Sequence, residues 1–129
     1  MISIGQKLPD AKFNVLTEKG MTELTTGDIF NGKKVAVLAL PGAFTPTCSA
    51  THLPGFIVNF DKFIAKGVDQ VVCLSVNDAF VMKAWKEASN AENILMLADG
   101  EALFTKALGL SVNRPGMGVR SHRYSMLVV

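Results

Sequence analysis

Short runs of apolar residues alternate along the chain with segments of helical periodicity. The runs at residues 35–40 and 71–76 are almost continuous and rich in β-branched side chains, a pattern typical of strands that are covered on both faces in a parallel sheet. Residues 94–98 and 124–129 carry weaker copies of the pattern, and residues 11–16 predict an outer strand. Together these runs predict one central sheet.

Helices are predicted between the strands. Over residues 56–64 the apolar side chains recur at a spacing that places them on one face of a helix, and Lys66 and Gly67 suit its end. Asn77 or Asp78 can cap the next helix. The apolar face of that helix is expected to consist of Phe80, Val81, Ala84, Trp85 and Ala88.

A shorter helix is predicted over residues 102–108, closed by Gly109, and residues 111–118 are expected to form a loop. Strands and helices thus alternate, which predicts an α/β fold with a largely parallel central sheet flanked by helices. No repeat or linker-like segment interrupts this order, so we expect a single domain over residues 1–129.

Composition narrows the possible functions. The 129 residues are 49% hydrophobic and 19% charged, with a formal net charge of +2, as in an ordinary globular protein. Such a weak charge gives no reason to expect a nucleic acid or a membrane as partner. The longest apolar run is far short of the roughly 20 residues of a membrane span. Without a recognisable secretory signal the chain is expected in the cytoplasm, where Cys48 and Cys73 should stay free thiols.

Cys48 lies where a strand gives way to a helix. Thr45 followed by Pro46 is typical of a helix start, with a hydroxyl at the N-cap and proline at N1, and this places Cys48 at N3. Free backbone N–H groups and the helix dipole favour a thiolate there. Pro54 is expected to kink or split the helix, because proline lacks the backbone N–H. The alternative for Cys48 is a buried packing residue.

These residues also carry a family resemblance. Pro41, Thr45 and Cys48 fit the Pro-x-x-x-Thr-x-x-Cys motif of the peroxiredoxins. The longer segment 41–56 resembles the peroxiredoxin 5 subfamily, which includes the plant type II enzymes and bacterial glutaredoxin-linked forms.

The resemblance continues at residues 73–80 and 120–128. It implies a thioredoxin-like fold with a mixed central sheet, and reduction of hydrogen peroxide and organic hydroperoxides without a metal or an organic cofactor. It also implies a further strand and a C-terminal helix after Val129, so the chain is expected to be a fragment or a short form. The strand at residues 124–129 would then lack a hairpin partner.

Four residues receive roles from the resemblance. Cys48 would be the peroxidatic cysteine, whose thiolate displaces one peroxide oxygen. Arg123 would hold the thiolate and donate to the peroxide through its guanidinium, the Thr45 hydroxyl would hydrogen-bond to the two oxygens, and Pro41 would shield the sulfur from water. Without the resemblance, Thr45 is equally well explained as a helix cap and Arg123 as a surface arginine. Of the neighbouring residues, Arg120 is expected at the periphery or a subunit contact, and His52 as a hydrogen-bonded structural residue.

The thiol that recycles Cys48 is less evident. Cys73 lies in an apolar strand and is expected to be buried, although related enzymes make it a possible resolving cysteine. The resemblance implies glutathione with glutaredoxin, or thioredoxin, as the reductant, and a homodimer. A different hypothesis is a peroxide-responsive redox sensor or interaction protein with little turnover. A disulfide oxidoreductase is disfavoured, because Thr45 stands where a Cys-x-x-Cys pair would need its first thiol.

Overall fold

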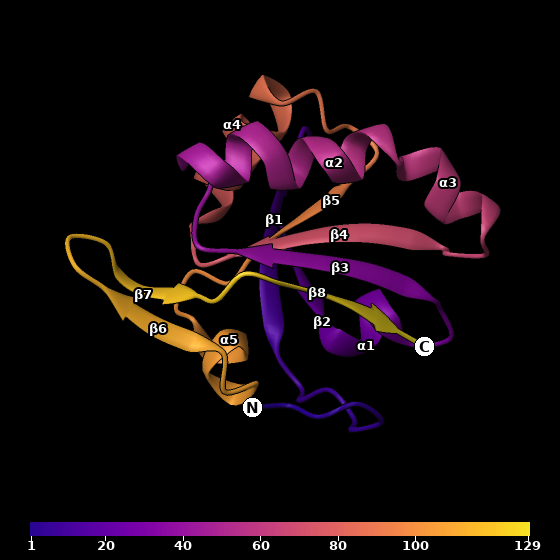
Figure 1. The fold of residues 1–129 in the computed structure, drawn as a ribbon, viewed down its shortest axis with the longest axis horizontal. Helices are drawn as coiled ribbons and strands as arrows, with labels where there is room; N and C mark the ends of the chain where they lie inside the picture. The colour runs from indigo at the N-terminus through magenta and orange to yellow at the C-terminus, as the bar shows by residue number, and fades with distance from the viewer.

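Six strands form the central sheet of the computed structural model, which describes residues 1–129 apart from the side chain of Ala50. Along the sheet their order is β2-β1-β5-β4-β3-β8. The central strands β3, β4 and β5 run parallel, whereas β1, β2 and β8 join by antiparallel pairing. The sheet is therefore mixed, as expected for a thioredoxin-like fold (Figure 1). Its strands are β1 (Lys12–Thr17), β2 (Gly20–Thr25), β3 (Val35–Leu40), β4 (Gln70–Ser75), β5 (Leu95–Ala98) and β8 (Tyr124–Val128).

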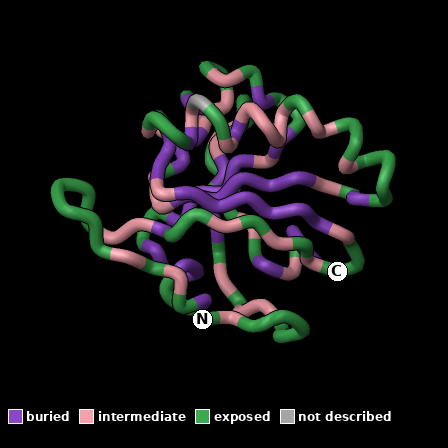
Figure 2. Tube along the Cα trace, in the orientation of Figure 1, coloured by how far each residue is buried: buried purple, intermediate pink, exposed green. Residues whose placement is uncertain are grey.

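The central strands β3 and β4 are buried on both faces (Figure 2). Successive side chains of a strand point to opposite faces, so each strand contributes to two clusters. Leu38 and Cys73 lie in the cluster on one face, and Val37 and Val72 lie in the cluster on the other. This two-sided burial explains why the sequence of these strands is apolar without alternation.

Helices cover both faces of the sheet (Figure 1). One face carries a helical segment that begins at Pro46 and passes through a π-helical turn, η1 (Cys48–His52), into α2 (Leu53–Val58). The same face carries α3 (Phe60–Ala65) and α4 (Ala79–Ala88). The other face is covered by α1 (Thr26–Phe30) and α5 (Leu103–Ala107). No helix within the described residues is long and apolar enough to cross a membrane.

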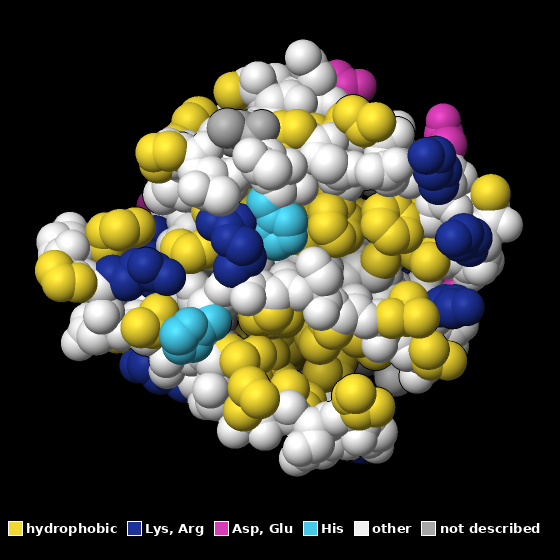
Figure 3. Space-filling view, in the orientation of Figure 1, with side chains coloured by type: hydrophobic (Ala, Val, Ile, Leu, Met, Phe, Trp, Pro, Cys, Tyr) yellow, Lys and Arg dark blue, Asp and Glu magenta, His cyan; other side chains and the backbone are white. Residues whose placement is uncertain are grey.

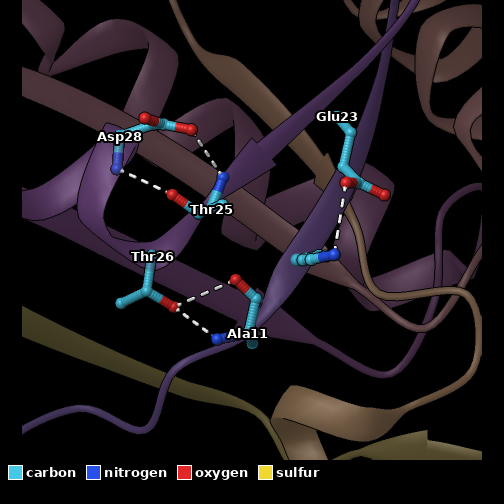
Figure 4. Close-up of polar contacts among 6 residues, drawn as sticks. Ala11, Glu23, Thr25, Thr26 and Asp28 are labelled. Atoms are coloured by element: carbon cyan, nitrogen blue, oxygen red, sulfur yellow. Dashed lines mark hydrogen bonds and ion pairs between the residues drawn. The ribbon is translucent and has the colours of Figure 1, made fainter.

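A capping box starts α1. The Thr25 hydroxyl accepts from the backbone N–H of Asp28 at 3.2 Å, and the Asp28 carboxylate accepts from the backbone N–H of Thr25 at 2.9 Å (Figure 4). The adjacent Thr26 hydroxyl accepts from the N–H of Ala11, which joins the helix to the start of β1. The sequence signal for this helix is the Thr-x-x-Asp spacing, because the side chains of such a pair satisfy each other's backbone donors.

Most of the predicted elements are confirmed, and the differences have physical causes. The expected loop at 111–118 is wrong, because its ends pair as a hairpin of β6 (Ser111–Arg114) and β7 (Gly118–Ser121). The predicted face of α4 is partly wrong: the helix buries Ala79, Met82 and Trp85, while Phe80 is 64% exposed. The expected irregularity around Pro54 takes the form of the π-helical turn ahead of it.

Candidate active site

The ends of three strands meet at one edge of the sheet. β3 and β4 are parallel and in register, with Leu40 opposite Ser75, so both carboxyl ends lie at this edge. β8 is antiparallel to β3, with Tyr124 opposite Ala39, so the start of β8 reaches the same edge. This register brings Arg123, which directly precedes β8, to the loop that follows β3. In α/β proteins this edge is where ligands usually bind.

Cys48 lies in the first turn of the helix that starts at this edge. The Ser49 N–H donates to the carbonyl of Thr45 at 2.9 Å, so Thr45 occupies the N-cap backbone position, as predicted. The next turn is wider, because the Leu53 N–H donates to the carbonyl of Cys48, five residues back. Single π-helical turns of this kind often occur at functional sites. The Cys48 side chain is fully buried.

Thr45 differs from the prediction in its side chain. Its hydroxyl donates to the carbonyl of Gly42 at 2.7 Å instead of capping the helix N–H groups. A hydroxyl has one hydrogen and two lone pairs. The hydrogen is therefore committed to Gly42, and the oxygen can face a substrate only as an acceptor.

Arg123 reaches Cys48 across 75 residues of sequence. Its Nη2 lies 3.2 Å from the Cys48 Sγ, and its Nη1 lies 2.9 Å from Nδ1 of His52. His52 follows Cys48 by four residues, and residues at this spacing lie on the same side of a helix. One guanidinium thus spans both side chains. The guanidinium places a positive charge 3.2 Å from the sulfur.

His52 is held on several sides. Its Nε2 lies 3.5 Å from the Ser125 hydroxyl, and its ring lies edge-on to Phe56 with a centroid distance of 5.6 Å. Burial, followed by the positive charge of Arg123, lowers the pKa of His52 below its usual value. These contacts confirm the expectation of a hydrogen-bonded residue, although no pattern along the chain indicates Arg123 as the partner.

Two further residues fix the loop between β3 and Cys48. The Asn77 side-chain oxygen accepts from the Ala43 N–H at 2.9 Å and from the Ser75 hydroxyl at 2.6 Å. With this loop held by Asn77, Phe44 adopts a φ of 62°, which costs energy in a bulky residue. The capping role considered for Asn77 belongs instead to Asp78, whose carboxylate accepts from the Val81 N–H.

Arg120 binds the same loop from the other side. Its Nη1 donates to the carbonyl of Val76 at 3.2 Å and to that of Pro41 at 3.5 Å, and its Nε donates to the carbonyl of Met117. Pro41 is half-buried and enters these contacts through its backbone. Arg120 therefore joins two loops and the β6–β7 hairpin, and the expected peripheral position is wrong. Only tertiary structure brings these carbonyls together, so the sequence carries no signal for this role.

Cys73 lies in β4 on the sheet face that Cys48 and its helix cover. Both thiols are free and fully buried, within one cluster of buried side chains. Burial, and secondarily the nearby Cys48, raise the pKa of the Cys73 thiol well above its usual range. Cys73 is therefore placed as a buried small side chain, as the sequence predicted.

The surface over the site is basic. In Figure 3, basic and histidine side chains lie beside one another on this face, above a hollow lined by hydrophobic side chains, and acidic side chains appear only towards its edge. Among the described side chains the ion pairs are Lys12 with Glu23 and Lys83 with Glu87, so neither site arginine is paired with a carboxylate. Within the same residues no group of three His, Cys, Asp or Glu side chains is placed to hold a metal.

Comparison with known proteins gives consistent matches. The model of the redoxin family matches residues 3–129. The chain is 46% identical to the chloroplastic peroxiredoxin-2E-2 of Oryza sativa subsp. japonica, over 98% of this chain and 60% of that protein. The first curated relatives are longer, and the chain spans 52% to 60% of their length.

Solved structures agree with the sequence matches. Reduced Prx3 of Vibrio vulnificus in complex with hydrogen peroxide is 58% identical, with a TM-score of 0.96 over 98% of this chain and 81% of that one. Peroxiredoxin 5 of Alvinella pompejana is 35% identical, with a TM-score of 0.88 over 98% of this chain and 82% of that one. The backbone that carries Cys48 and Arg123 is thus shared with these proteins.

Proposed function

Because the chain belongs to the redoxin family, and within it to the peroxiredoxin 5-like peroxiredoxins, we propose that it is a thiol peroxidase acting through Cys48. The observation that carries the proposal is the 3.2 Å contact between Arg123 Nη2 and the buried Cys48 Sγ. The substrates would be hydrogen peroxide and alkyl hydroperoxides. The similar Vibrio vulnificus protein was crystallised with hydrogen peroxide, which supports the first of these.

The chemistry starts with the Cys48 thiolate. Its sulfur attacks one oxygen of the peroxide, an S–O bond forms as the O–O bond breaks, and the other oxygen leaves as hydroxide or alkoxide, which takes up a proton. Cys48 becomes a sulfenic acid, so sulfur loses the two electrons that the peroxide gains. Negative charge moves from sulfur to the leaving oxygen, and fixed donors that face this charge accelerate the step.

The donors come from Arg123 and the helix start. The guanidinium carries several N–H groups in one plane, so it can touch the sulfur and a peroxide oxygen together. Backbone N–H groups of the first helical turn, which lack partners within the helix, add further donors. The Thr45 oxygen would accept from the peroxide O–H, because its own hydrogen is committed to Gly42. The half-buried Pro41 would limit access of water to the sulfur.

For the reductant we propose glutathione with glutaredoxin, with thioredoxin as the alternative. The support is the state of Cys73: it is fully buried, and its raised pKa keeps it a thiol, which is a poor nucleophile. An external thiol would condense with the sulfenic acid to a mixed disulfide and water, and a second thiol would release Cys48. Free cysteines also suit a reducing compartment, so we propose a cytoplasmic location.

A homodimer is the proposed assembly. Phe44, in the loop that leads to Cys48, is 53% exposed, and Phe80 at the start of α4 is 64% exposed. Phe44 also lines a groove with Trp85 and Pro54. Exposed apolar side chains, here Phe44 at this groove and Phe80 on α4, are typical of an interaction surface, and a second copy would bury them. Sedimentation of the protein and of Phe80→Glu tests this: a dimer that the variant converts to monomer supports it, and a monomeric wild type contradicts it.

Peroxide turnover tests the central proposal. Hydrogen peroxide consumption would be followed with glutathione and glutaredoxin, or with thioredoxin and its reductase, for the wild type, Cys48→Ser and Arg123→Ala. We expect no turnover in Cys48→Ser and a loss of about 100- to 1,000-fold in Arg123→Ala, the usual effect of removing one such donor. Turnover that persists in Cys48→Ser would contradict the proposal. A single oxidation followed by arrest with both reductants would favour a redox sensor.

A further inference from the structure

His52 contacts Arg123 but has no part in the peroxide chemistry described above. Its Nδ1 lies 2.9 Å from Arg123 Nη1, and its Nε2 lies 3.5 Å from the Ser125 hydroxyl. The ring packs edge-on against Phe56. These contacts come from the helix of Cys48, from the residue before β8 and from β8 itself.

The chemistry of arginine decides the protonation of His52. Every guanidinium nitrogen is a donor and none can accept, so Nδ1 must offer its lone pair to Arg123. A histidine with a free lone pair on Nδ1 is neutral, with its hydrogen on Nε2. That hydrogen points to the side on which the Ser125 oxygen lies. The contact with Arg123 therefore exists only while His52 is neutral.

His52 also fixes the direction of the guanidinium. Nη1 and Nη2 belong to one rigid plane, so Nη1 held on His52 limits where Nη2 can point. Nη2 is the nitrogen 3.2 Å from Cys48 Sγ. Arg123 is exposed, and His52 and Cys48 are its hydrogen-bond partners among the described side chains. When the sulfur attacks the peroxide, Cys48 is the partner of Arg123 that changes chemically, whereas His52 takes no part in the reaction.

We propose that His52 is a positioning residue that holds Arg123 on Cys48 in its neutral form and releases it when protonated. The inference rests on the proposed peroxidase function. Protonation would remove the acceptor at Nδ1 and place a second positive charge beside the guanidinium. The pH response would thus come from a hydrogen bond that is lost and from charge repulsion.

The surroundings of His52 agree with a neutral ring. Arg123 is the cation that faces it, Cys48 is the titratable group on its own helix, and Ser125 and Phe56 from β8 and α2 are uncharged. No carboxylate among the described side chains pairs with the ring. Burial and Arg123 accordingly lower the pKa of His52, so the ring takes up a proton only at a pH below the ordinary histidine pKa of about 6.5.

The test compares two replacements of His52 with a matched control. In His52→Asn the amide oxygen can accept from Arg123 but cannot titrate, and in His52→Leu no acceptor remains. His122→Asn removes the other histidine of the chain, which is exposed. The rate constant for a single turnover with hydrogen peroxide is measured from about pH 8 to well below pH 6.5, together with the thiolate content of Cys48 from its ultraviolet absorbance.

At neutral pH we expect the single-turnover rate of His52→Leu to fall about tenfold, the effect of one hydrogen bond to a charged group. The rate at which an added thiol reduces oxidised Cys48 should change little. His52→Asn should keep the rate at neutral pH within about twofold. As the pH is lowered, the rate of the wild type should fall more than its loss of Cys48 thiolate explains, whereas the rate of His52→Asn should fall only in proportion to that loss. His122→Asn should follow the wild type. An unchanged rate in His52→Leu would overturn the proposal. So would a rate of His52→Asn that falls at low pH as the rate of the wild type does.

A second measurement separates this inference from the peroxidase function. Nitrogen NMR of the imidazole should show Nδ1 without hydrogen and Nε2 with hydrogen at neutral pH. In Arg123→Ala the pKa of His52 should rise, because a neighbouring positive charge is removed. If peroxide turnover is absent but both NMR results hold, the function fails and the positioning contact stands. If turnover is normal but Nδ1 carries the hydrogen, the positioning proposal fails alone.

Discussion

The indole N–H of Trp85 donates to the hydroxyl of Ser49 at 3.1 Å, so the residue that follows Cys48 is tied to α4. Trp85 is the one tryptophan of the chain and is almost completely buried. Cys48 is fully buried as well, so its oxidation to a sulfenic acid adds an oxygen next to this contact. We expect this added oxygen to shift the turn that contains Ser49.

We predict that this shift changes the fluorescence of Trp85. One equivalent of hydrogen peroxide should alter the emission of the wild type, and dithiothreitol should restore it. Cys48→Ser is the control and should not respond. Ser49→Ala, which removes the partner of the indole, should reduce both the response and the stability, the latter by about 1 kcal/mol. A response of equal size in Cys48→Ser would show that the signal comes from another residue.

Gly42 provides a test of the loop that carries Thr45. A Cβ at this position would lie 3.0 Å from Arg120 Nη1 and 3.2 Å from Thr45 Cγ2. Gly42→Ala should therefore push Arg120 away from the carbonyls of Pro41 and Val76. We expect a loss of about 1–3 kcal/mol in the free energy of unfolding, as for other overpacked sites, and a lower rate with hydrogen peroxide.

The matched control for this substitution is Gly55→Ala in α2. Nothing lies within 4 Å of a Cβ built at Gly55, and alanine is the better helix former by about 0.5–1 kcal/mol. Urea unfolding should thus show one glycine replacement that destabilises and one that does not. Equal stability of the two variants would mean that Arg120 does not depend on the space at Gly42.

The sequence predicted the centre of the fold better than its edges. β3 and β4 are buried on both faces, so their composition alone marks them as strands. β2 was missed because it is an edge strand with mostly exposed side chains, and no hydrophobic pattern distinguishes it from a loop. The hairpin of β6 and β7 was missed for the same reason.

The candidate site divides in the same way. Cys48 and its helix start are local features, and the sequence Thr45-Pro46 predicts them. Arg123 could be found only through the family motif, because its place beside Cys48 depends on the register of β8 on β3. The contacts of Arg120 and His52 depend on tertiary structure alone, and no spacing along the chain predicts them.

Asp28 gives a prediction about stability and pH. Its carboxylate accepts from the Thr25 N–H, and this bond, with a further contribution from the Thr25 hydroxyl, lowers the pKa of Asp28 below 3.8. A carboxylate with a lower pKa in the folded state stabilises the fold above the unfolded-state pKa, and this stabilisation is lost as the pH falls through the folded-state pKa. Asp28→Asn should therefore be less stable than the wild type at pH 7, and the difference should shrink below pH 3.8.

Urea unfolding of the wild type and of Asp28→Asn, at pH 7 and below pH 3.8, measures this difference in stability. Asp61→Asn is the control, since Asp61 is also exposed in the first turn of a short helix but the N-cap of α3 has no side-chain hydrogen bond. Its effect should be smaller at pH 7. A difference for Asp28→Asn that persists unchanged in acid would show that the charged capping box is not its cause.

Cys73 decides how the catalytic cycle closes. The raised pKa of this buried thiol keeps it protonated at neutral pH, and the side chain faces the core in the same cluster as Cys48. We expect Cys73→Ala to keep peroxide turnover with an external thiol and to lose about 1 kcal/mol of stability, as for the loss of one buried heavy atom.

In the native protein, iodoacetamide should label Cys48 well before Cys73. With one equivalent of peroxide and no added thiol, peptide mass mapping should find oxidised Cys48 and unmodified Cys73. A Cys48–Cys73 disulfide in that experiment, together with loss of turnover in Cys73→Ala, would instead make Cys73 the resolving thiol and require η1 to unfold in each cycle.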